Sequence, residues 1–218
     1  KSSSRRSIRR ALSYRMAARV SALSDAALHR YLSDAVYLER LRFGQERPTE
    51  SRDHEERDQI AQAARAVHQG RSEMEDALSV LVKGYANEIH TRFSDKAYGL
   101  ATKLAPGALN RLLTSAKTTG APAAVDLEDR VVVHGPTAEI ARLAKDHTLI
   151  LVPNHVSNLD SPLVGLALHQ AKLPPFIYGA GLNLFSNPAM AFFMSRLGAY
   201  TVDRRKRHRL YKDVLKDY

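Results

Sequence analysis

The stretch that decides the fold is "TLILVPNHVSNLDSPL", residues 148–163. Its first six residues, 148–153, form an apolar run that is long enough for a strand and too short for a helix. Pro153 ends this run, the polar residues after it can form a turn, and Asp160 falls where the next helix would begin. We therefore expect a strand, a turn that contains His155, and a helix.

Strands and helices alternate on both sides of this stretch. The further strand candidates are residues 130–134, 175–179 and 199–202, and the helix candidates are residues 137–146, 160–170 and 188–196. This alternation predicts an α/β domain with a mostly parallel sheet that is flanked by helices.

The sequence before about residue 120 has helical patterns instead. Apolar residues recur at three- and four-residue steps from Met74 to Ile89, which predicts a helix with one buried face. The small, Pro- and Gly-containing stretch 118–126 separates the two patterns. We therefore expect an all-helical N-terminal region, residues 1–120, followed by the N-terminal part of an α/β domain, residues 121–218.

Composition and charge narrow the function classes. The chain has no cysteine, which excludes disulfides and a thiol nucleophile, and it has no apolar run long enough for a transmembrane helix. Its net charge of +10 predicts an anionic partner. Seven Lys and Arg lie in residues 1–20 and seven in residues 204–216. We expect a membrane surface rather than nucleic acid, because no basic platform with interleaved aromatic residues is present.

The first of these basic segments carries Ile8, Leu12, Met16 and Val20 at four-residue spacing. This pattern suits a helix on a membrane surface. It is also compatible with a transit peptide or with a solvated helix.

The spacing His-x4-Asp occurs four times, so the spacing alone does not identify a site. On a helix the two residues would lie about 140° apart and could not meet. This argument removes the pairs that begin at His29 and His208, which have helical patterns around them, and nothing apolar or glycine-rich surrounds the pair that begins at His90. His155 and Asp160 instead follow a predicted strand, at the carboxyl end where open α/β sheets place their sites.

A neighbouring His and Asp can perform general base catalysis. The imidazole takes a proton from a substrate hydroxyl, while the carboxylate orients the ring and stabilises the cation. No G-x-S-x-G motif is present, so we expect direct attack by the substrate hydroxyl. The alternative is a polar turn in which Asp160 caps a helix and His155 is exposed.

Four stretches resemble the glycerolipid acyltransferases, whose first conserved block is N-H-x4-D. They are "LILVPNHVSNLDSPL" (149–163), "GAGLNLF" (179–185), "RLGAYTVDRR" (196–205) and "YANEIHTRFSDKAYGLATKLAPGALNRLL" (85–113). The chain looks most like the membrane-associated glycerol-3-phosphate 1-O-acyltransferase branch.

The resemblance implies roles for individual residues. His155 matches the catalytic base and Asp160 its charge partner, while Arg204 matches an arginine that contacts the phosphate of the acceptor. Asn183 is a candidate to line the site. The resemblance implies no metal and no bound cofactor. The pair Asp203-Arg204 departs from the two arginines frequent in the nearest relatives, which leaves the identity of the acceptor open. The family's next block does not occur in these 218 residues, so we expect either part of a longer protein or an incomplete, inactive site.

The resemblance thus implies a peripheral membrane enzyme on the cytoplasmic face. It would move a fatty acyl group from acyl-CoA or acyl-carrier protein to the sn-1 hydroxyl of glycerol-3-phosphate, giving lysophosphatidic acid for phospholipid synthesis. Dihydroxyacetone phosphate and lysophosphatidic acid are the competing acceptors. A different class of function is a catalytically silent membrane- or phospholipid-binding module of the same fold. Nucleic acid is not an expected partner.

Overall fold

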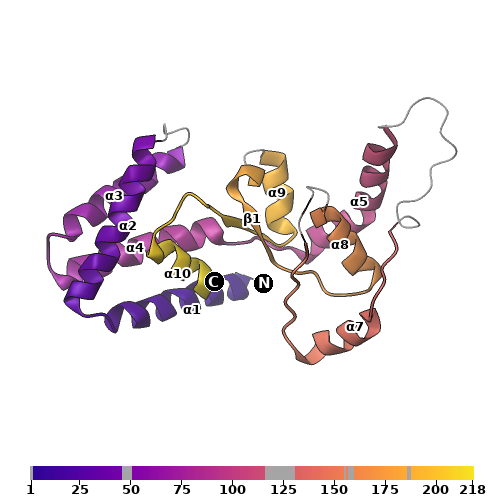
Figure 1. Ribbon diagram of the computed structural model, residues 1–218, viewed down its shortest axis with the longest axis horizontal. Coiled ribbons are helices and arrows are strands. Elements are labelled where there is room, and N and C mark those ends of the chain that lie inside the picture. The colour runs from indigo at the N-terminus through magenta and orange to yellow at the C-terminus, as the bar shows by residue number, and fades with distance from the viewer. Residues whose placement is uncertain (1, 46–50, 116–130, 155, 157–159, 186–187) are drawn as a thin grey trace. The chain divides into compact units, whose positions relative to one another are not determined.

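The computed structural model describes residues 2–45, 51–115, 131–154, 156, 160–185 and 188–218 (Figure 1). The chain divides into two compact units. Unit 1 comprises residues 1–90, 180–183 and 201–218, and unit 2 comprises residues 91–179 and 184–200. The expected domain boundary at residues 120 and 121 lies outside the described residues and stays a prediction.

Unit 1 is a bundle of helices. Its helices are α1 (Ser2–Ser21), α2 (Asp25–Gln45), α3 (Ser51–Ala66), α4 (Arg71–Ile89) and α10 (Arg209–Asp217). Helix α4 packs against α1, α2, α3 and α10, so it forms the centre of the bundle. The C-terminal helix α10 also packs against α1 and α2, although it lies more than 160 residues from them in sequence.

The core of unit 1 follows the apolar periodicity of its helices. The predicted stripe of α4 is buried, with Leu78 only 1% and Leu81 only 2% exposed. In α1, Leu12, Met16 and Val20 are also buried. The side chain of Ile8 lies outside the described residues. The apolar stripe of α1 therefore packs inside unit 1, which favours neither a helix on a membrane surface nor a fully solvated one.

Unit 2 contains the remaining helices that the structure describes. They are α5 (Asp95–Ser115), α7 (Thr137–Asp146), α8 (Asp160–Gln170) and α9 (Pro188–Arg196). Helix α5 packs against α8 and α9. The bounds of α7, α8 and α9 confirm the three helices that the sequence predicts at residues 137–146, 160–170 and 188–196.

A small parallel sheet pairs β1 (Tyr178–Gly181) with β2 (Ala199–Val202). The short 3-10 helix η1 (Leu182–Phe185) follows β1, and residues of β1, β2 and η1 are distributed over both units. Gly198 precedes β2 with a φ of +106°, and a Cβ atom there would lie 2.9 Å from the Phe176 carbonyl oxygen. Only glycine fits this position without strain. The predicted strand at 199–202 is confirmed, and the one at 175–179 forms three residues later than predicted.

The sheet is smaller than the sequence predicts. Residues 131–134 and 148–153 are expected strands, but in the described part of the chain both are irregular. Ile150 and Val152 are 85% and 86% exposed. An apolar run becomes a strand only where a neighbour completes its hydrogen-bond ladder, and the ladder that the structure describes joins β1 to β2 alone. The fold class is nevertheless confirmed: a helical N-terminal region precedes an α/β region with a small parallel sheet.

A helix that crosses a bilayer must be both long and apolar. None of the helices formed by the described residues is both long and apolar enough to cross a membrane.

Candidate active site

Asp160 is the first residue of α8, where the sequence predicts a helix to begin. Its Oδ2 atom accepts a hydrogen bond of 2.6 Å from the backbone N–H of Val156, which follows His155 in the chain. The carboxylate therefore binds a backbone group that lies four residues before it in the chain. Residues 155 and 157–159 of the predicted turn lie outside the described residues, so the turn stays a prediction.

His155 itself lies outside the described residues. What the structure gives is a carboxylate that contacts the residue next to it. A carboxylate in such a place can orient an imidazole and stabilise its cation. The pairing of His155 with Asp160 as catalytic groups stays a prediction.

The other His-x4-Asp pairs have different surroundings. His29 and Asp34 are both exposed on α2, as expected for residues on different faces of a helix. His208 directly precedes α10, where its Nδ1 atom accepts from the Tyr211 N–H and its Nε2 atom lies 3.0 Å from Glu39 Oε1. His208 is thus a buried helix cap, whereas Asp213 accepts a hydrogen bond from the Tyr31 hydroxyl.

Arg204 is exposed in a tight turn of unit 1. The turn is closed by a hydrogen bond of 3.2 Å from the Lys206 N–H to the Asp203 carbonyl oxygen. Within the part of the chain that the structure describes, the Arg204 guanidinium has no ion-pair partner. An exposed guanidinium of this kind can offer two parallel hydrogen bonds to a phosphate.

Asn183 is exposed in η1, also in unit 1. A Cβ atom on Gly181 would lie 2.6 Å from its Oδ1 atom, so the glycine makes room for this amide. The two predicted substrate-binding residues therefore belong to unit 1, and Asp160 belongs to unit 2. The structure gives no distance between Asp160 and the two substrate-binding candidates.

The cations that flank Arg204 are held by acidic residues. Arg205 donates two side-chain hydrogen bonds to the Asp203 carboxylate, at 2.9 Å and 2.8 Å. The Lys206 side chain is only 1% exposed and forms ion pairs with Glu56 and Glu88. Sequence alone would place all these cations on one basic surface, but the structure turns Lys206 into the interior.

Lys206 is part of a buried polar cluster that sequence reasoning missed. We call it the Lys206 network, and its members are Glu39, Arg42, Glu56, Glu88, Lys206 and His208. Arg42 Nη2 lies 2.5 Å from Glu39 Oε2 and 2.8 Å from Glu56 Oε2, and Lys206 Nζ lies 2.5 Å from Glu88 Oε2. A signal was present in the sequence, because Glu39 and Arg42 continue the apolar stripe of α2.

The network shifts the acidity of its members. Burial alone would raise the pKa of Glu39, but the hydrogen bond from His208 and the charges of Arg42 and Lys206 bring that pKa below its ordinary value. Burial raises the pKa of Tyr85, and the nearby Glu39, Glu56 and Glu88 carboxylates raise it further. Glu39 is therefore a carboxylate and Tyr85 a neutral phenol at neutral pH.

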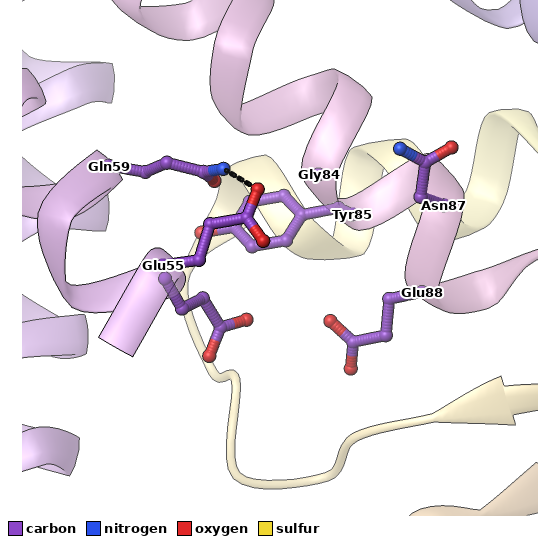
Figure 2. Close-up of a pocket in the computed structure, with 7 residues that line it drawn as sticks. Glu55, Gln59, Gly84, Tyr85, Asn87 and Glu88 are labelled. Atoms are coloured by element: carbon purple, nitrogen blue, oxygen red, sulfur yellow. Dashed lines mark hydrogen bonds between the residues drawn. The ribbon is translucent and has the colours of Figure 1, made fainter. Parts of the chain in front are cut away.

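A pocket of about 210 Å³ lies next to the network, between α3 and α4. Figure 2 shows Glu55 and Gln59 of α3 facing Tyr85 and Glu88 of α4 across it. The lining contains three carboxylates, those of Glu55, Glu56 and Glu88. Because these would repel a phosphate, we do not assign this pocket to the phosphate acceptor.

In the ranges that the structure describes, no group of three or more His, Asp or Glu is placed to hold a metal ion. The expectation that the reaction needs neither metal nor cofactor stays a prediction.

The chain was compared with known proteins. The family model described as Acyltransferase matches residues 130–217, which is less than half of the chain. No solved structure matches. The matched range includes the N-H-x4-D stretch, Asn183 and Arg204. This match supports the glycerolipid acyltransferases as the family of this region and acyl transfer as its general class of activity.

Proposed function

We propose that the protein transfers a fatty acyl group from acyl-CoA or acyl-carrier protein to the sn-1 hydroxyl of glycerol-3-phosphate, giving lysophosphatidic acid. One observation carries the proposal. The Acyltransferase match includes N-H-x4-D, and within that motif the Asp160 carboxylate binds the N–H of the residue after His155. Catalysis by this motif requires a turn between His155 and Asp160, because a helix would place the two side chains about 140° apart.

In this mechanism His155 is the general base. Its imidazole takes the proton of the sn-1 hydroxyl as the oxygen attacks the thioester carbonyl, and the C–S bond then breaks. The imidazolium returns the proton to the leaving thiolate, so the enzyme ends in its starting state. Asp160 holds the tautomer and stabilises the imidazolium. An ordinary histidine pKa of about 6.5 suits both transfers near neutral pH.

Arg204 would bind the phosphate of the acceptor. The phosphate is a dianion near neutral pH, and the planar guanidinium matches it with two charge-assisted hydrogen bonds. The support is that Arg204 is exposed while its neighbours Arg205 and Lys206 are engaged by carboxylates. Asn183 would contribute an amide to the same acceptor.

A membrane surface is the proposed partner, with the protein bound peripherally on the cytoplasmic face. The acyl product is lipid-soluble, so a reaction at an anionic surface would release it where it dissolves. Exposed cations on α1, on α10 and in the turn before α10 support this. They are Arg10, Arg15, Arg204, Arg207, Arg209, Lys212 and Lys216. Each such cation near an anionic surface adds about 1 kcal/mol of attraction.

The test is acylation of radiolabelled glycerol-3-phosphate by the full-length protein, with acyl-CoA and acyl-carrier protein as alternative donors. Dihydroxyacetone phosphate and lysophosphatidic acid serve as competing acceptors. We expect lysophosphatidic acid as the product, with glycerol-3-phosphate preferred over both competitors. Salt-sensitive binding to anionic vesicles without any acyl transfer would replace the proposal by a silent lipid-binding module.

A further inference from the structure

The turn that carries Arg204 is fixed to the helical bundle at Lys206. The Lys206 side chain enters unit 1 and ends between the carboxylates of Glu56 on α3 and Glu88 on α4. Its Nζ atom also lies 5.0 Å from the ring centre of Tyr85 and 5.6 Å from that of Tyr211. Two acidic and two aromatic groups therefore surround one ammonium group.

Asp203 fixes the other side of the turn. Its backbone N–H donates to the Tyr211 hydroxyl at 2.9 Å, and its carboxylate accepts from the Arg205 N–H at 3.0 Å. Asp203 is only 2% exposed. Five residues after Asp203, His208 is held by Glu39 and caps α10. The turn thus has buried attachments before and after Arg204.

These attachments leave Arg204 in a defined place. The side chains of Asp203, Lys206 and His208 are buried, whereas that of Arg204 is exposed. Since the backbone on both sides is held, the guanidinium starts from a restricted region of space. An anion that binds a restricted side chain loses less entropy on binding, so preorganisation raises affinity.

Burying a lysine at this position costs more free energy than burying an apolar residue would. Taking the ammonium and two carboxylates out of water costs free energy that their attraction only partly returns, and an apolar residue of similar size would pack there more cheaply. An apolar side chain could slide within a core, whereas the ammonium must lie between Glu56 and Glu88. The two ion pairs therefore fix the position of the Lys206 side chain.

We propose that the N-terminal helical bundle is a positioning device for the acceptor site: Glu56 and Glu88, acting through Lys206, hold the 203–208 turn so that Arg204 is presented to the phosphate. This rests on the proposed function, in which Arg204 binds the acceptor. Glu56, Glu88 and Lys206 are positioning residues, and none of them is assigned a contact with substrate.

The experiment uses the full-length protein with the three charges removed together, as Glu56→Gln, Glu88→Gln and Lys206→Met. Removing the whole set avoids the unpaired buried charge that a single change would leave. The matched control is Lys83→Met, which removes an exposed lysine of α4. Circular dichroism and thermal unfolding first verify that both variants are folded.

We expect the triple variant to raise the KM for glycerol-3-phosphate about 10- to 100-fold, the loss typical of a misplaced binding group. The KM for the acyl donor should change by less than about two-fold. Hydrogen exchange of the backbone amides at 203–208 should become faster. In an Arg204→Ala background the same three changes should raise the KM no further, because the network acts through Arg204. Lys83→Met should change none of these quantities.

Two results would overturn the inference. One is a folded triple variant with an unchanged KM for the acceptor, whatever its exchange rates. The other is a KM increase of equal size in the Arg204→Ala background. Failure of the proposed function looks different: the unmodified protein would not acylate glycerol-3-phosphate, or Arg204→Ala alone would leave its KM unchanged.

Discussion

The two units differ in how far their apolar side chains are buried. In unit 1 large apolar side chains of α1, α2 and α4 are buried, such as Leu12, Leu32 and Leu78, and the interior encloses charged groups as well, such as Glu39 and Lys206. In unit 2 the apolar run at 150–152 is exposed, and so are Phe192 and Phe193 of α9, at 52% and 54%. Both regions have regular apolar patterns in sequence, yet among the residues that the structure describes only those of unit 1 build a closed core.

The difference follows from how helices and strands complete their backbone hydrogen bonds. A helix completes its backbone hydrogen bonds internally and needs only a neighbour for its apolar face. In unit 1 that neighbour is the next helix in sequence for α2 and α3 and for α3 and α4, and a more distant helix for α1 and α4 or α10 and α4. A strand depends on a partner strand for its backbone. Residues 148–153 have the composition of a strand without that partner in the described chain.

The largest stability effect is expected at the charged interior of unit 1. Lys206→Met alone would take the Lys206 ammonium away from the Glu56 and Glu88 carboxylates, of which Glu56 keeps Arg42 at 2.8 Å. Removing one partner of a buried ion pair costs about 3–5 kcal/mol of unfolding free energy. Urea unfolding followed by circular dichroism measures this loss. Lys83→Met, at an exposed position of the same bundle, should change the free energy by less than about 0.5 kcal/mol. Equal effects of the two changes would mean that the network contributes nothing to unit 1.

The next effect contrasts an apolar residue from each unit. Leu78→Ala removes a side chain that is 1% exposed in unit 1, and we expect a loss of about 2–5 kcal/mol. Ile150→Ala changes a residue that is 85% exposed in unit 2, and we expect less than about 0.5 kcal/mol. Both are read from the same urea titration. A loss at Ile150 comparable to that at Leu78 would show that the 148–153 run is packed in the protein, and the contrast between the units would disappear.

The smallest expected effect is a change of stability with pH in the acidic range. Burial would raise the pKa of Asp203, but the hydrogen bonds from the Arg205 side chain and backbone and the charge of Lys206 bring it below its ordinary value. A carboxyl with a lowered pKa stabilises the fold above about pH 4 and loses this contribution as the pH falls through the pKa of the folded state. Glu39 behaves in the same way.

We therefore expect Asp203→Asn to be less stable than the unmodified protein by about 1 kcal/mol at neutral pH, since its partner Arg205 is half exposed. The difference should shrink as the pH falls below about 4. Thermal unfolding across this range measures it. A difference that is constant from neutral to acid pH would show that the carboxylate charge of Asp203 has no part in stability.

Much of the fold could be predicted from local pattern. The apolar periodicity of α4, the bounds of α7, α8 and α9, and the strand at 199–202 all agree with the sequence, because each depends on residues close in the chain. The strands at 130–134 and 148–153 could not be predicted correctly, since pairing is a property of distant segments. The path of α10 into unit 1 is of the same kind: nothing local in residues 209–217 shows that they pack against α1 and α2.

The candidate site shows the same limit. The helix start at Asp160 could be predicted from the proline and the polar residues before it. The exposed position of Arg204 agrees with a binding role. The neighbouring Lys206 could not be separated from Arg204 in "DRRKRH", because four adjacent cations look alike in sequence. A signal of the charged interior was that Glu39 and Arg42 continue the apolar stripe of α2.

The central claim is that His155 acts as a general base in acyl transfer, and the chain contains its own control. His29 has the same His-x4-Asp spacing but is exposed on α2. The measurement is the turnover of glycerol-3-phosphate acylation by the full-length protein with His155→Ala and, separately, with His29→Ala. We predict that His155→Ala lowers kcat by about 10²- to 10⁴-fold without unfolding the protein, and that His29→Ala leaves kcat unchanged. A folded His155→Ala protein with undiminished turnover would contradict the account.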